Sequence, residues 1–251
     1  NTAVGYVAGA ALTTGEENTL IGYQSGDALS TGGNNVAVGR GSLTSATTGD
    51  HTVAIGSLAL QSVTTAEGNV AIGRLALQDN TAANNTAIGY DVLKENTTGA
   101  ANTAVGALAL DANTTGSSLV AIGKGALGAN TTANDNTAVG DSAMLANTTG
   151  TQNVAVGKSA LLVNTTGSYN TAVGVLALDA NTTASNHTAI GYAALGANTS
   201  GTNNTAVGYQ TLILNTTGIS NVALGHNTLS ANTTGAGNTG LGYQALANNE
   251  T

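Results

Sequence analysis

The stretch Asn-Thr-Ala-Val-Gly-Tyr-Gln-Thr-Leu-Ile-Leu-Asn-Thr-Thr-Gly at residues 204–218 contains the pattern that decides the fold. The pattern recurs along all 251 residues, and its first glycine falls at 5, 22, 39, 56, 73, 89, 106, 123, 140, 157, 174, 191, 208, 225 and 242. The step is 17 residues, except for one step of 16 between Gly73 and Gly89, where a residue is missing around 81–83. The chain therefore holds fifteen copies of one unit, counted from Asn1, and the last is cut short at Thr251.

The composition of each repeat position predicts two short strands separated by turns. Position 2 is Thr in nine copies and Val in six, and position 4 is always Val, Ile or Leu. These β-branched residues suit a strand, and because alternate strand residues share a face, we expect positions 2 and 4 to point into the core and positions 1, 3 and 5 away from it. Position 9 is Leu in twelve copies and Met144 in another, which predicts a second inward-pointing column. The glycine and Asn-Thr-Thr-Gly segments between these strands favour turns.

Stacking of such units predicts an all-β fold, a parallel β-solenoid or β-roll of fifteen 17-residue coils. With about 4.8 Å per coil, the array would be on the order of 70 Å long. We interpret residues 1–251 as one continuous repeat array from a longer fibre protein, with slightly irregular coils over 1–84 and regular coils over 85–251.

The composition excludes several classes of function. Charged residues are only 7% of the chain, and 13 acids outnumber 5 bases, so no basic surface is available for nucleic acid. No apolar run approaches the ~20 residues of a membrane-spanning helix, so we expect no membrane insertion. Cysteine, proline, tryptophan and phenylalanine are absent.

A strip of alanine at position 3 predicts self-association. It occupies thirteen copies, with Leu20 and Gly240 as the exceptions. A lone coil would bury few aliphatic side chains against the entropy of ordering seventeen residues, so further apolar burial is needed. We therefore predict a homotrimer, in which a flat alanine strip lets chains approach closely. Its candidate interface residues are Ala104, Ala121, Ala138, Ala155 and Ala172.

The repeats resemble those of a known group of surface proteins. Asn102-Thr-Ala-Val-Gly106, Asn153-Val-Ala-Val-Gly157 and Thr52-Val-Ala-Ile-Gly56 look like the repeats in the heads of YadA-type trimeric autotransporter adhesins. The longer unit, as in residues 204–218, is similar to repeats of bacterial surface and phage tail-fibre proteins. The resemblance covers the whole chain and implies a left-handed parallel β-roll trimer on a cell or virion surface. The adhesin heads have a shorter period than 17 residues.

Position 6 gathers most of the aromatic and basic side chains into a ridge. This ridge is either an edge that keeps the fibre soluble or a surface that binds a host-cell glycan or receptor, since tyrosines and cations can hold sugars. Its members are Tyr6, Tyr23, Arg40, Arg74, Tyr90, Lys124, Lys158, Tyr192, Tyr209 and Tyr243.

The asparagine at position 12 begins a formal N-glycosylation motif in nine copies. Turn chemistry and a stacked asparagine ladder explain the column equally without glycans, and we favour that interpretation. The asparagines are Asn96, Asn113, Asn130, Asn147, Asn164, Asn181, Asn198, Asn215 and Asn232. Stacked threonines also suggest ice binding, but free exchange with valine at position 2 argues for burial of that column.

No repeated set of residues carries catalytic chemistry or binds a cofactor. His51, His187 and His226 fall at three different repeat positions, and the pair Glu16 and Glu17 occurs in one turn only. We therefore predict a protein without enzymatic activity, cofactor or metal. The leading hypothesis is a structural fibre of an adhesin or tail fibre that presents a receptor-binding end, and the alternative is a solenoid that binds a glycan or, less readily, ice.

Overall fold

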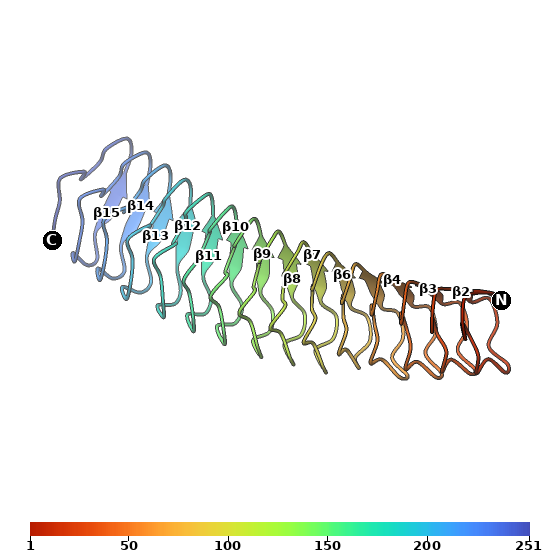
Figure 1. Cartoon of the computed structure of the whole chain (residues 1–251). Coiled ribbons are helices and arrows are strands. Elements are labelled where there is room, and N and C mark those ends of the chain that lie inside the picture. Colours follow the sequence, from red (N-terminus) through yellow and green to blue (C-terminus); the bar gives the residue numbers. More distant parts are fainter. The chain divides into compact units, whose positions relative to one another are not determined.

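The computed structural model describes residues 1–251 and contains no helix. Each of the fifteen repeats supplies one three-residue strand at positions 2 to 4, and the rest of each coil is turns (Figure 1). The fold is thus an all-β parallel β-solenoid, as the period predicted. The second short strand predicted around position 9 is absent, because that segment is a run of turns. The strands are β1 (Thr2–Val4), β2 (Thr19–Ile21), β3 (Val36–Val38), β4 (Val53–Ile55), β5 (Val70–Ile72), β6 (Thr86–Ile88), β7 (Thr103–Val105), β8 (Val120–Ile122), β9 (Thr137–Val139), β10 (Val154–Val156), β11 (Thr171–Val173), β12 (Thr188–Ile190), β13 (Thr205–Val207), β14 (Val222–Leu224) and β15 (Thr239–Leu241).

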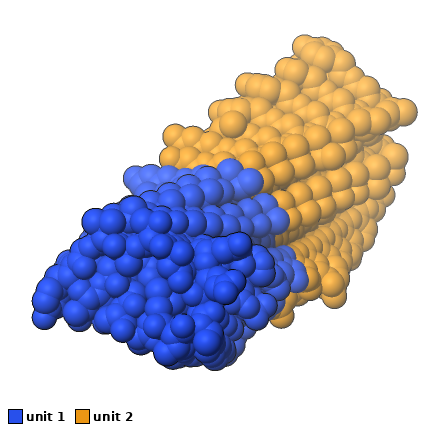
Figure 2. All heavy atoms as spheres, turned by 90° about the vertical axis from the view of Figure 1, so that its right-hand side faces the viewer, with its two compact units in different colours: residues 1–124 blue, residues 125–251 orange.

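The chain divides into two compact units, residues 1–124 and 125–251 (Figure 2). In the first, β1 to β8 pair in chain order, and in the second β9 to β15 do the same, always parallel and with equal repeat positions opposite each other. Ala71 still lies opposite Ala87 across the 16-residue step. The missing residue is therefore absorbed in the turn at 81–84, and the register of the strands is kept.

Close approach between successive coils explains the glycine at position 5. Gly106 has a φ of +130°, and a Cβ there would lie 2.6 Å from the carbonyl oxygen of Gly123 in the next coil. Three other positions are left-handed without being glycine: Leu108, Leu110 and Ser118 have φ values of 59°, 53° and 58°. Because this conformation costs an L-residue roughly 1–2 kcal/mol, the turns of a coil depend on contacts with its neighbours.

The predicted facing of the strand is wrong. Ala104, Ala121, Ala138, Ala155 and Ala172 at position 3 are completely buried inside single chains, while Val105 and its equivalents at position 4 point outward. The predicted inward column at position 9 is confirmed, since Leu110 and Met144 are fully buried. Together with a buried small residue at position 8, such as Ala109, these long side chains fill a narrow interior that leaves only the volume of a methyl group at position 3.

The second coil meets the same limit on interior volume with the large residue at position 3 and the small one at position 9. Its position 3 is Leu20, which is fully buried, and position 9 of the first two coils is Gly9 and Gly26. A Cβ on Gly26 would lie 2.9 Å from Leu20 Cδ2. The leucine thus reaches the interior from the opposite wall, and glycine makes room for it.

Two columns of buried asparagine run through the interior. At position 1, Asn35 accepts the Thr52 N–H at Oδ1 (3.0 Å) and donates from Nδ2 to the Gly49 carbonyl (2.9 Å). At position 12, Asn181 Nδ2 donates to Asn164 Oδ1 (2.9 Å) and to the Ala184 carbonyl (3.0 Å). Wherever successive coils carry asparagine, both columns therefore link one coil to the next through side-chain amides.

The position-12 column changes character along the chain. The first four coils carry apolar residues there, and from Asn80 onward every coil carries asparagine. The change occurs in the 16-residue coil, the last coil before the regular repeats begin at residue 85. The apolar residues are Leu12, Leu29, Ala46 and Val63.

Replacing one ladder asparagine should destabilise the protein strongly. Asn164→Ala removes the partners of Asn147 Oδ1, Asn181 Nδ2 and the Gly167 carbonyl, so we expect a loss of about 2–4 kcal/mol in the free energy of unfolding, measured by urea denaturation. Thr165→Val is the matched control, because it removes a single hydrogen bond of an exposed hydroxyl to the Thr182 carbonyl (3.0 Å) and should cost less than about 1 kcal/mol. Equal losses in the two variants would show that the buried ladder has no special weight.

Candidate functional surfaces

The outward side chains of the strands form an apolar surface that we call the strand face, made of positions 2 and 4 of each coil. Ile55, Ile88 and Ile122 are 37%, 38% and 40% exposed, and the Thr or Val at position 2 is half-buried in most coils. A strand of three residues is about 10 Å long, so the eight strands of residues 1–124 give a face on the order of 400 Å². A contiguous apolar patch of this size is at the level that marks interaction sites on soluble proteins.

The ridge at position 6 borders the strand face, and all ten of its predicted members are exposed. Its aromatic rings stack on one another along the coils. The ring centroids lie 5.3 Å apart for Tyr6 and Tyr23, 5.2 Å for Tyr192 and Tyr209, and 4.9 Å for Tyr209 and His226. Within a stack, each ring therefore lies over the face of its neighbour, and the ring edges and hydroxyl groups remain free. The contact with a glycan or receptor that the sequence suggested for this ridge stays a prediction.

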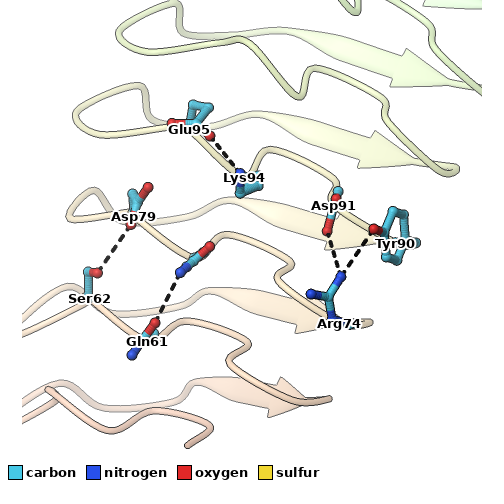
Figure 3. A network of polar contacts seen from close by, with 9 residues as sticks. Gln61, Ser62, Arg74, Asp79, Tyr90, Asp91, Lys94 and Glu95 are labelled. Carbon is cyan, nitrogen blue, oxygen red and sulfur yellow. Dashed lines mark hydrogen bonds and ion pairs between the residues drawn. The ribbon is translucent and has the colours of Figure 1, made fainter.

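Near the 16-residue coil, the ridge joins a polar network that links successive coils (Figure 3). Arg74 Nη1 donates to the Tyr90 hydroxyl (3.1 Å), lies 3.8 Å from Asp91 Oδ1, and its guanidinium sits 5.5 Å from the centre of the Tyr90 ring. Ser62 Oγ donates to Asp79 Oδ1 (3.4 Å) in the next coil. These contacts are half-exposed pairs that reinforce stacking, and each is worth under about 1 kcal/mol.

The position-12 asparagines that match the glycosylation motif are inaccessible to a glycan in the folded coil. Asn96, Asn113, Asn130, Asn147, Asn164, Asn181, Asn198, Asn215 and Asn232 are all completely buried. The Nδ2 atom that a glycan would modify is a hydrogen-bond donor inside the ladder, as for Asn215, which donates to Asn198 Oδ1 (3.0 Å) and the Gly218 carbonyl (3.1 Å). The column is the asparagine ladder that the sequence favoured.

The alanine columns are likewise no subunit interface. Both the position-3 column and the second column at Ala109, Ala126 and Ala143 lie inside single chains with no exposed surface. Any surface through which chains associate must consist of other residues, and the strand face is the large apolar surface that the coils expose.

His187 takes the place of asparagine in the position-1 ladder, a role that the sequence analysis missed. Its N–H donates to Asn170 Oδ1 (3.1 Å), and its ring Nδ1 accepts the Asn204 N–H (3.3 Å) as an asparagine oxygen would. Its Nε2 lies 3.3 Å from Asn198 Nδ2. Burial lowers the pKa of His187 to about 4. The sequence contains a signal for this role, because His187 falls at repeat position 1, where every other copy except Thr52 and Leu119 has asparagine.

The remaining titratable groups do not come together in a reactive cluster. His51 lies exposed in a turn, His226 belongs to the aromatic stack, and no group of three or more His, Asp or Glu side chains could hold a metal ion. Partial burial raises the pKa of the Asp111 and Asp179 carboxyls. Both lie at position 10, in separate coils without an acid-base partner.

Comparison with known proteins gives no relative: no protein-family profile, curated protein or solved structure matches this chain. The structure holds no helix with the length and apolar character needed to cross a membrane.

His187 should make the stability of the protein depend on pH. Because its pKa falls from 6.5 in the unfolded chain to about 4 in the folded one, the neutral ring contributes stability that is complete above pH 6.5 and is lost as the pH falls toward 4. His187→Asn restores the ladder residue without a titratable group, so its melting temperature should fall less than that of the wild type between pH 7 and pH 4. His51→Asn, which changes an exposed histidine, should follow the wild type. Parallel melting curves for wild type and His187→Asn would contradict the assignment.

Proposed function

We propose that this chain is a non-enzymatic structural segment of an extracellular fibre, an adhesin or a phage tail fibre, that associates as a homotrimer through its strand face and spaces a receptor-binding end from a cell or virion surface. The observation that supports this most is the strand face itself. Its side chains are half-buried or exposed in the single chain, yet positions 2 and 4 contain only Thr, Val, Ile and Leu in all fifteen copies.

The size of the strand face fits association of whole arrays. At about 25 cal/mol per Å², burying a face of about 400 Å² on residues 1–124 contributes on the order of 10 kcal/mol. Association itself costs about 4–15 kcal/mol in lost freedom of motion. A few coils would therefore not hold chains together, whereas many coils in one array would, which agrees with a long repeat.

The two rims of the strand face differ in charge and favour parallel chains. The position-6 rim carries Arg40 and Arg74, whereas the opposite rim, at positions 16 and 17, carries the exposed Glu16, Glu17 and Glu67. When parallel chains are arranged around a common axis, the basic rim of one chain lies beside the acidic rim of the next. When antiparallel chains pack face to face, the two basic rims meet each other and so do the two acidic rims. Three chains rather than two is the number that the resemblance to YadA-type head repeats favours.

A second candidate function rests on the exposure of position 2. The reason against ice binding was that exchange of Thr with Val meant burial, but the strand face points outward, with its methyl groups repeated in register from coil to coil. A stably folded single chain that is retained by ice, and loses retention when the strand face is charged, would favour this function over assembly.

Charging the strand face should abolish assembly. Ile55→Lys combined with Ile88→Lys places ammonium groups on the strand face, so the mass measured by light scattering should fall from three chains to one while circular dichroism keeps its β-signal. Leu108→Lys is the matched control, because Leu108 is also 37% exposed but lies at position 7, off the strand face. A folded wild-type monomer would refute the trimer, and a charged variant that keeps its mass would move the interface elsewhere.

The number of coils should set the length of the fibre segment. The chain has no cysteine, so spin labels can be attached at Thr149→Cys and Thr234→Cys, two exposed turn positions five coils apart in residues 125–251. Deleting residues 153–186, two whole coils, should shorten the distance between the labels by about 10 Å, measured in labelled chains diluted with unlabelled ones. Deleting residues 153–182 breaks the register and should unfold this segment. An unchanged distance after the two-coil deletion would contradict the role as a spacer.

A further inference from the structure

Six of the seven exposed tyrosines fall into two groups according to their neighbours, and the seventh, Tyr243, lies beside the ring of His226 with the centroids 5.4 Å apart. Tyr6 stacks on Tyr23 with ring planes 14° apart, and Tyr192 stacks on Tyr209 with planes 15° apart. Tyr90 lies on the same ridge but has Arg74 over its ring. Tyr169 lies at position 17, 60% exposed, on the opposite rim. Stacked pairs and isolated tyrosines therefore occur in one chain.

We propose that Tyr6 with Tyr23, and Tyr192 with Tyr209, are sites of oxidative cross-linking to dityrosine by a haem peroxidase and hydrogen peroxide. Each phenol gives up one electron and one proton to become a phenoxyl radical. The two radicals couple through ring carbons next to the oxygen-bearing carbons, and the hydrogen on each coupled carbon then moves by way of solvent to the phenolic oxygen of the same ring, which restores the hydroxyl group and the aromaticity. The pair thus loses two hydrogen atoms, which reduce one hydrogen peroxide to two waters.

The solenoid supplies the geometry and the access that this reaction needs. The rings of each pair come from the same position of successive coils, and the strand register fixes their backbones, as in the pairing of Thr188 to Ile190 with Thr205 to Val207. Centroids 5.2 and 5.3 Å apart put the reacting rings in contact, so only side-chain rotation is left for bond formation. All four tyrosines are 43% to 68% exposed and open to an oxidant.

The products would join the first coil to the second and the twelfth to the thirteenth. Each bond closes a 17-residue loop on the outside of the solenoid, where the coils are otherwise linked by hydrogen bonds and stacking alone. The inference does not depend on the number of chains in the fibre, because both residues of each pair belong to one chain.

Treatment of the folded chain with a haem peroxidase and hydrogen peroxide tests the proposal. We expect the blue fluorescence of dityrosine, single-chain mobility on a denaturing gel for the main product, and two cross-linked peptide pairs that each lack two hydrogen atoms. Tyr23→Phe should remove the first pair, Tyr209→Phe the second, and the double variant both. The combination of Tyr90→Phe with Tyr169→Phe is the control and should leave both intrachain products unchanged.

Other outcomes would overturn the proposal. One is dityrosine that persists within the chain of the double variant, and another is product found only between chains. A third outcome is a yield of dityrosine from the stacked pairs that is the same in the folded chain and in the chain unfolded in urea. This result would show that the fold does not select these pairs for cross-linking. Circular dichroism of each variant separates loss of product from loss of fold, because phenylalanine keeps the stacking ring.

Discussion

The requirement that each coil lie in register on the next is the constraint on which the rest of this structure depends. Strands of three residues provide few hydrogen bonds, and three left-handed positions per coil are unfavourable by themselves. Contacts between coils compensate for both. They include strand pairing, the close approach of the position-5 glycines and the asparagine amides at positions 1 and 12. Each of these contacts depends on the corresponding position of the next coil, which is why the sequence repeats so closely.

The buried ladder also explains why asparagine occupies position 12 in a continuous block. An amide in the interior must have partners, since an unpaired buried donor or acceptor costs about 1–3 kcal/mol. Asparagine satisfies this requirement when both neighbouring coils carry it too. Where the block begins, Asn80 Nδ2 donates to the Ala82 carbonyl (2.7 Å), and its Oδ1 accepts from Asn85 (3.1 Å) and Asn96 (2.7 Å). The coils before it fill the column with apolar side chains, and a mixture of the two would leave amides unpaired.

The sequence predicted the period, the strand at positions 2 to 4, the inward leucine and the turns, because each depends on residue type at a fixed spacing. It did not predict which side of the strand faces inward. Alternation allows two solutions, and the larger apolar side chains at positions 2 and 4 suggested the wrong one. The correct one depends on the volume across the coil, where Leu110 from one wall leaves room only for Ala104 on the other. A clue was present in the second coil, where Leu20 occurs together with Gly26.

For the surface residues too, the sequence predicted what depends on residue type at one repeat position and missed what depends on contacts between coils. The ridge could be found from the sequence because its tyrosines and bases share position 6, but the stacking of its rings required the register of the coils. His187 was missed because it resembles an isolated residue until its column is compared with the asparagines around it.

Once position 4 is known to point outward, its composition needs an explanation that the single coil does not supply. Exposed strand positions ordinarily accept Lys, Glu, Gln and Ser, since water solvates them all. The turns of this chain do vary in this way, with Glu16, Gly33, Asp50 and Glu67 at one repeat position. Positions 2 and 4 lie in the same coils and contain no charged residue in fifteen copies. A constraint of this strictness on an exposed surface is typical of residues that are covered in the working state of a protein. The interior requires the coil-to-coil register, and the strand face repeats that register on the outside of the solenoid, so a surface that covers it along its length must have the same period, as a parallel copy of this chain would.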